Sequence, residues 1–131
     1  MLITKTLLLL LTITSLLQAK HLHKEKYYQK IFCSKMNGIL EYRLRDKTRV
    51  DCLTSTYAIE VDFATKWAES IGQSLYYSLE TNTRPGVLLI TEKKKKDMKY
   101  LRRLKRVAKE SDIQIWTIDK NLVIKRIRIK K

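Results

Sequence analysis

The chain has 131 residues and a formal net charge of +15, with 28 lysines and arginines against 13 aspartates and glutamates. A chain of this length can build one hydrophobic core and is too short for two ordinary domains. Its two cysteines exclude a disulfide-rich scaffold, because they permit only one bridge. The charge excess indicates a polyanionic partner, which could be nucleic acid, an anionic membrane surface or an acidic polysaccharide.

The first nineteen residues have the layout of a cleavable secretory signal. Lys5 provides a positive charge, a leucine-rich apolar run covers residues 6–17, and Ala19 offers a small residue at the cleavage point. The run is shorter than the roughly 20 residues that a membrane-spanning helix requires. We therefore expect a periplasmic or secreted protein whose single mature domain covers residues 20–131, with no stable membrane insertion. An uncleaved membrane anchor is the alternative.

Most of the positive charge lies in the last third of the chain. Residues 20–92 contain eleven basic and nine acidic side chains, whereas residues 93–131 contain sixteen basic and four acidic ones. The carboxylates that could form a site are therefore concentrated in the first stretch, and the side chains that attract a polyanion in the second.

The mature segment is predicted to begin with a frayed stretch, a helix and three strands. Residues 20–26 are polar and charged, and residues 27–36 have apolar or aromatic side chains at helical spacing. Asn37-Gly38 ends this helix, because both residues tolerate a positive φ. Alternation of polar and apolar side chains then predicts strands over residues 39–44, 49–54 and 57–63.

After residue 63 the pattern becomes helical. Residues 64–79 predict a helix whose apolar stripe is Ala64, Ala68, Ile71, Leu75 and Leu79, with Lys66, Ser70, Gln73 and Tyr77 on the reverse face. A buried strand over residues 87–91, a basic amphipathic helix over residues 93–109 and a core strand over residues 113–118 follow. Residues 121–131 alternate again and form either a strand or a basic tail.

This order, αβββαβαβ, predicts the α/β class. A hairpin-like run of strands followed by crossover helices gives a mixed central sheet with helices on its faces.

Three motifs stand on these elements: Arg49-Val50-Asp51 on the second strand, Glu60-Val61-Asp62 on the third, and Gln73-Ser74-Leu75-Tyr76-Tyr77 on the next helix. Together with the order of elements they resemble the PD-(D/E)xK, or restriction-endonuclease-like, nuclease superfamily, over nearly the whole mature chain. The resemblance implies a restriction-endonuclease-like fold and hydrolysis of phosphodiester bonds with Mg²⁺ or Mn²⁺. The implied metal ligands are Asp51 and Glu60, with Glu41 and Asp62 as further carboxylates, and Gln73 and Tyr77 match a Gln-x-x-x-Tyr helix motif.

The sequence departs from this pattern at one position. Where the superfamily has a catalytic lysine two residues after the glutamate, this chain has Asp62. Either Lys66 replaces that lysine from the following helix, or catalysis is lost and a metal-binding or nucleic-acid-binding protein remains.

The chemistry is reasonable without the resemblance. Phosphodiester hydrolysis needs a cation that offsets phosphoryl charge and activates a water molecule. Mg²⁺ keeps several of its waters, so one or two carboxylates are enough to bind it. Neighbouring strands are about 4.8 Å apart, so Asp51 and Glu60 can share a cation if they face the same way. The plain alternative is that the outward acids of the third strand form only a solvated sheet face.

Cys33 and Cys52 are expected to form a disulfide in an oxidising compartment; two free buried thiols are the alternative. The basic helix is expected to bind nucleic acid without base-specific readout, DNA rather than RNA, and no small-molecule cofactor is expected. The cationic residues assigned to this contact are Lys93, Lys94, Lys95, Lys96, Lys99, Arg102, Arg103 and Arg106.

We therefore expect an exported nuclease of low sequence specificity. A catalytically inactive nucleic-acid-binding protein on the same fold is the first alternative, and a cationic protein that binds membrane or envelope polyanions is the second. The oligomeric state is left open.

Overall fold

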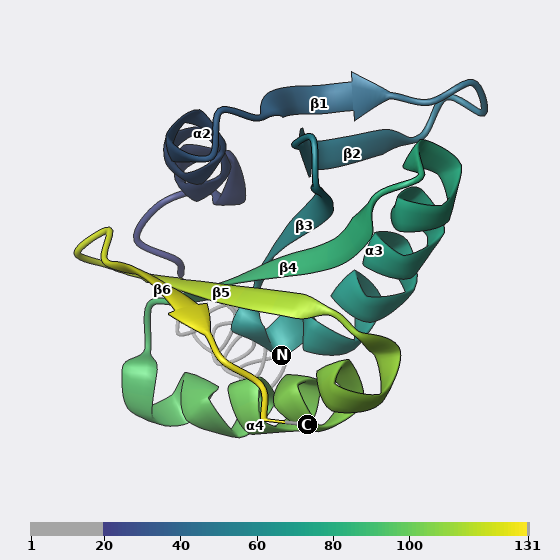
Figure 1. The fold of residues 1–131 in the computed structure, drawn as a ribbon. Coiled ribbons are helices and arrows are strands. Elements are labelled where there is room, and N and C mark those ends of the chain that lie inside the picture. The colour runs from purple at the N-terminus through teal and green to yellow at the C-terminus, as the bar shows by residue number, and fades with distance from the viewer. Residues whose placement is uncertain (1–19, 131) are drawn as a thin grey trace, which may run out of the picture.

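Three helices and a six-stranded sheet form residues 20–130, the part of the chain that the computed structural model describes (Figure 1). The expected signal segment, residues 1–19, lies outside this part. The elements are α2 (Glu25–Lys35), β1 (Ile39–Arg43), β2 (Arg49–Leu53), β3 (Tyr57–Phe63), the 3₁₀ turn η1 (Ala64–Lys66), α3 (Trp67–Thr81), β4 (Arg84–Thr91), α4 (Lys94–Ser111), β5 (Gln114–Asp119) and β6 (Ile124–Ile127).

The six strands lie side by side in chain order, β1 to β6. β1, β2 and β3 are antiparallel neighbours, β3, β4 and β5 are parallel, and β6 returns antiparallel to β5. The two parallel connections contain α3 and α4, because parallel strands need a long crossover. The α/β class, the mixed sheet and the predicted order of elements are confirmed. The last segment, left open between a strand and a tail, includes the short strand β6.

The helices cover both faces of the sheet (Figure 1). Tyr28 and Phe32 of α2 pack in one core cluster with Ile59 and Val61 of β3. α3 and α4 cover the opposite face, where Val87, Leu89 and Ile115 form a second cluster with Leu101 and Leu104. Because side chains alternate along a strand, Glu60 and Asp62 of β3 belong to this second face. No helix within residues 20–130 has both the length and the apolar character needed to cross a membrane.

The predicted apolar stripe of α3 is only partly correct. Ala64 is buried and Ile71 and Leu75 pack against the second core cluster, but Ala68 is exposed. The helix buries Ser70, Ser74, Tyr77 and Ser78, while Leu79 is 81% exposed. The serine hydroxyls donate hydrogen bonds to carbonyl groups of their own helix, at 2.7, 3.0 and 2.8 Å, so their burial leaves no polar group unpaired. Small side chains on this face let α3 lie close to β3 and β4. The hydrophobic pattern therefore predicted the helix correctly but did not identify the serine-rich face that it buries.

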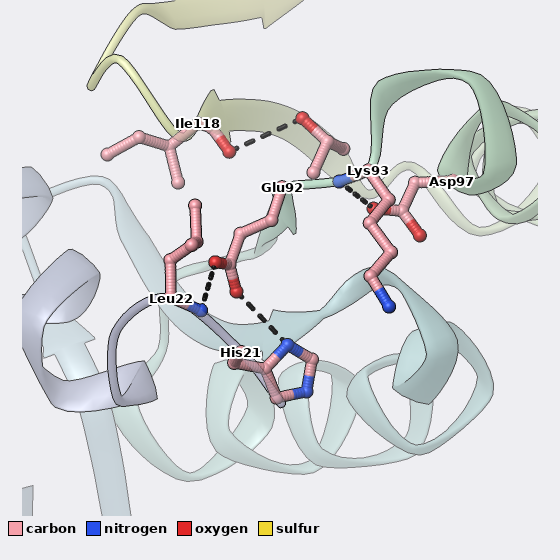
Figure 2. Close-up of polar contacts among 7 residues, drawn as sticks. His21, Leu22, Glu92, Lys93, Asp97 and Ile118 are labelled. Carbon is pink, nitrogen blue, oxygen red and sulfur yellow. Dashed lines mark hydrogen bonds and ion pairs between the residues drawn. The ribbon is translucent and has the colours of Figure 1, made fainter. Parts of the chain in front are cut away.

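The start of the mature segment is held in place, contrary to the expected fraying. The Glu92 carboxylate, directly after β4, accepts hydrogen bonds from the Leu22 backbone N–H at 2.7 Å and from His21 Nδ1 at 3.0 Å (Figure 2). The His21 ring stacks on Phe63 at the end of β3, with ring centroids 3.4 Å apart. We call these contacts the N-terminal clasp. It fixes the point from which α2 begins at Glu25.

The predicted disulfide between Cys33 and Cys52 is present and joins α2 to β2. Gly38 lies against it: a Cβ at this position would be 2.4 Å from Cys52 Sγ and 2.7 Å from Cys33 Sγ. No side chain fits there, so the turn after α2 needs a glycine for space. The bridge and the clasp together attach both ends of α2 to the sheet.

Replacing both cysteines, in Cys33→Ala/Cys52→Ala, should lower the free energy of unfolding by about 3 kcal/mol, because the bridge closes a loop of this length in the unfolded chain. Urea denaturation measures the change. A reductant should shift the wild-type midpoint and leave that of the double variant unchanged. Equal midpoints of the oxidised wild type and the double variant would contradict the prediction.

Candidate active site

The candidate site lies where β2 and β3 separate. The two strands pair only at Cys52 with Ile59 and Leu53 with Ala58, although β2 extends back to Arg49 and β3 extends on to Phe63. Val50 packs with Ala58 and Tyr77, whereas Cys52 lies in the core cluster beneath α2, so β2 twists at the residue between them. That residue is Asp51.

Asp51 and Glu60 meet in the gap between the strands. Asp51 Oδ2 accepts a hydrogen bond of 2.8 Å from the Val61 N–H, which takes the place of a regular bond between the strands. The Asp51 N–H points to Glu60 Oε1 at 3.5 Å. The expected proximity of these two carboxylates is therefore present. Glu60 is only 4% exposed, so its acid group is not part of a solvated sheet face.

Asp62, two residues along β3, is 7% exposed and faces the same site. Its Oδ2 atom is buried and has no hydrogen-bond partner within the described part of the chain. A buried carboxylate oxygen without a donor is unusual in a folded protein, and either a cation or a proton shared with the neighbouring Glu25 carboxyl group would satisfy it. Asp62 is thus a carboxylate at the site and not a substitute for the lysine of the motif.

Lys66 and Glu25 approach Asp62 from two other elements. Lys66 ends η1, which follows β3 directly, and Glu25 begins α2 beyond the N-terminal clasp. Burial raises the pKa of both acids, and the charge of Lys66 opposes this rise. An exposed lysine therefore stands beside the carboxylates, in agreement with its predicted position.

Glu41 borders the site through a strained backbone. It stands opposite Asp51 where the pairing of β1 and β2 is interrupted, and its φ is +52°. This conformation costs a residue other than glycine roughly 1–3 kcal/mol. Glu41 accepts a hydrogen bond of 3.1 Å from the buried Gln29 amide, which also donates to the Asp51 carbonyl at 2.9 Å. Gln29 thus ties α2 to β1 and β2.

Burial and mutual repulsion keep protons on the acids. Burial raises the pKa of Asp62 to about 7, with the charges of Glu25 and Asp51 adding to the effect. The pKa of Glu60 is raised far above its ordinary value by burial and by the Asp51 charge, and burial also raises the pKa of Asp51. At neutral pH the cluster therefore retains protons that a bound cation would displace.

Only one residue of the Gln-x-x-x-Tyr pair lies next to the acids. Tyr77 is buried, and its pKa is raised by burial and by the nearby Glu60 charge. Gln73 is exposed on α3. The predicted stripe of Lys66, Ser70, Gln73 and Tyr77 is thus divided between the solvent and the sheet.

The predicted nucleic-acid contacts lie along the solvent face of α4. All eight cationic residues, from Lys93 to Arg106, are exposed. Lys93 and Thr65 line the same small cavity of about 50 Å³, so the basic run at the start of α4 lies close to Lys66. Lys99 and Arg103 sit over the Tyr100 ring, at 4.9 and 5.6 Å from its centroid. Positive charge thus flanks the acidic site on one side.

Sequence reasoning did not identify Glu25 and Gln29. They are four residues apart and share one face of α2, a spacing that signals a polar patch on an otherwise buried helix. The helix was predicted from its apolar positions alone and from residue 27 onward, so Glu25 was assigned to the frayed start. The spacing of Glu25 and Gln29 is the sequence feature that could have identified both residues.

Within residues 20–130 no three or more His, Cys, Asp or Glu side chains are arranged so that they could hold a metal ion together. A cation would therefore rest on one or two carboxylates and its own waters. No protein family, curated protein or solved structure matches the chain.

The acids predict the pH dependence of stability in EDTA. A carboxyl group whose pKa is raised on folding stabilises the protein below its unfolded pKa, and this contribution is lost as the pH rises through the folded value. For Asp62 the loss should occur between about pH 4 and pH 7. Melting in EDTA should be higher at pH 5 than at pH 8 by at least about 4 °C.

The matched variant is Asp62→Asn, which keeps the shape without the charge. In EDTA at pH 8 it should melt above the wild type, and Mg²⁺ or Mn²⁺ should raise its melting temperature less. If the wild type and Asp62→Asn respond equally to pH and to metal, the carboxyl group of Asp62 is not a buried acid awaiting a cation.

Proposed function

We propose that the mature chain is a metal-dependent nuclease of restriction-endonuclease-like architecture, exported and of low sequence specificity. The observation that carries the proposal is the meeting of Asp51, Glu60 and Asp62 where β2 and β3 separate, with a buried Asp62 oxygen that lacks a donor. The order of elements, αβββαβαβ, is the one that the resemblance to the superfamily implies.

One or two of the carboxylates of Asp51, Glu60 and Asp62 would hold Mg²⁺ or Mn²⁺ together with its own waters, with Glu41 and Glu25 at the border of the site. A bound divalent cation supplies charge for the phosphoryl oxygens and lowers the pKa of a water molecule. Oxygen ligands in a site with room for water suit these two cations. Asp51 also fixes the separation of the strands, because its carboxylate holds the Val61 N–H.

Lys66 is the residue that we propose in place of the motif lysine. It stands next to Asp62 at the end of η1, and its ammonium group can orient a water molecule or balance phosphate charge. The exposed cations of α4 then supply the attraction for the substrate backbone, DNA more readily than RNA.

One observation favours a second function. Glu60 and Asp62 are almost fully buried beneath α3, and the position of the motif lysine is an acid. A protein with this architecture could bind nucleic acid through its cationic surface without hydrolysing phosphodiester bonds.

Incubation of the mature protein with plasmid and with linear single-stranded DNA separates these functions. We expect degradation with Mg²⁺ or Mn²⁺ and none with EDTA. Glu60→Gln should reduce the rate at least about 100-fold, because loss of even a supporting group at a metal site costs about 10–100-fold. Glu80→Gln, an exposed acid on α3, is the matched control and should cleave normally. Binding without degradation by the wild type would leave the second function.

Lys66→Ala should abolish cleavage while DNA affinity changes little, because one of many cations is lost but an ammonium group that acts on Asp62 is removed. Lys30→Ala, on the far face of the sheet, removes an equal charge as a control. Gel-based cleavage and fluorescence anisotropy in EDTA measure the two effects separately. Normal cleavage by Lys66→Ala would exclude the role proposed for this lysine.

A further inference from the structure

A basic groove lies at the other end of the sheet. It is a recess of about 830 Å³ between the end of α4, the first residues of β4 and β5, and the segment that continues from β6. Its cationic lining consists of Arg84, Lys109, Arg126, Arg128 and Lys130, with Asp112 as the one carboxylate among the described lining residues. Apolar residues that join the core of the α4 face, Ala108, Ile113, Ile127 and Ile129, form its floor.

The guanidinium groups of Arg126 and Arg84, two residues of the groove, converge on a neutral oxygen of Tyr57, which is not among the residues that line the groove. The Tyr57 hydroxyl accepts a hydrogen bond from Arg126 at 3.1 Å and a longer one from Arg84 at 3.5 Å. The Arg84 guanidinium also lies over the Tyr57 ring, 5.5 Å from its centroid. Tyr57 is itself buried and packs edge-on against Trp116, so its hydroxyl is a fixed point. The two arginine forks are therefore held in place by the core.

Most of the groove's cationic side chains have no ion-pair partner among the described residues. Within residues 20–130 there are three ion pairs, and Arg84 with Asp112 is the only one of them in the groove. Arg126, Arg128, Lys109 and Lys130 are exposed and take part in none of the three. Like charges so close together repel, and a bound anion relieves that repulsion. Arginine forks match the geometry of phosphate oxygens in particular.

The groove is separate from the acidic site and from the basic start of α4. Tyr57 and Arg84 pair at the first register position of β3 and β4, whereas Asp62 pairs with Leu89 near the other end. Lys93 and the N-terminal clasp are at that other end as well. The predicted contacts on α4 therefore do not account for the groove, although Lys109 in the last turn of α4 borders it.

We propose that the basic groove binds a single-stranded segment of nucleic acid through its phosphates. Its volume lies within the roughly 300–1,000 Å³ of sites that enclose a compact ligand. A flexible strand can enter such a recess, placing phosphates on the cationic rim and sugar or base on the apolar floor. A flat membrane or a rigid duplex would meet mainly the convex face of α4. That the anion is nucleic acid rests on the proposed function, but the binding itself requires no cleavage.

Anisotropy of a short labelled single-stranded oligonucleotide, titrated in EDTA so that no cleavage occurs, tests the proposal. Arg126→Ala/Arg128→Ala should weaken binding at least about tenfold at moderate salt. It should also reduce the slope of log affinity against log salt by about 1.4, because each phosphate contact of a single strand contributes about 0.7. Lys30→Ala/Lys35→Ala removes the same charge from exposed positions of α2 and should change neither quantity appreciably.

A second variant protects the test against misfolding, since Arg126 also bonds to Tyr57. Arg128→Ala/Lys130→Ala removes two exposed cations of the groove that make no such bond, and should lower the salt slope equally. If both groove variants bind like the α2 control, the proposal is overturned. It is also overturned if they lose affinity only for phosphatidylglycerol vesicles and not for the oligonucleotide. Because EDTA is present throughout, a protein that never cleaves DNA still gives an unambiguous result.

Discussion

The hydrogen bond from the Val61 N–H to the Asp51 carboxylate is the contact on which the candidate site depends. A backbone donor at this position of an antiparallel pair would ordinarily meet a carbonyl of the neighbouring strand. Here a side chain takes it, at 2.8 Å, and the two strands separate without leaving the donor unpaired. The gap created in this way is where Glu60 and Asp62 are brought near Asp51. Strand geometry and acid placement are consequences of one interaction.

Keeping such a gap open costs free energy, and the contacts of α2 offset part of this cost. The acids are buried close to one another, and Glu41 holds a left-handed backbone beside them. Against this, the disulfide attaches the end of α2 to β2, and the N-terminal clasp attaches its beginning to β4. Gln29, midway along the helix, bonds to Glu41 of β1 and to the backbone of Asp51 in β2. A helix fastened at three points keeps apart two strands that would otherwise pair.

The sequence was sufficient to predict the elements whose side chains follow one clear period. Alternation located β1, β2 and β3 and put Glu60 and Asp62 on one face, and the change of period located α3. It failed where packing and not hydrophobicity chose the face: α3 turns Ser70 and Ser74 inward because small side chains allow a close approach to the sheet. The contribution of Glu25 depends on the packing of α2 against β3, which brings Glu25 to Asp62, and no local pattern encodes such an approach.

The uneven distribution of charge along the chain has a structural meaning. Carboxylates from the first part of the chain collect between α2, β2 and β3, where burial strengthens their repulsion. Cations from the last part line the exposed side of α4 and the basic groove at the other end of the sheet. If the two sets were interleaved they would neutralise each other through salt bridges, yet residues 20–130 contain only three. Because the two sets of charges are apart, a cation can bind to the acids and an anion can bind to the cationic surface. A polyanion accompanied by divalent metal satisfies both at once.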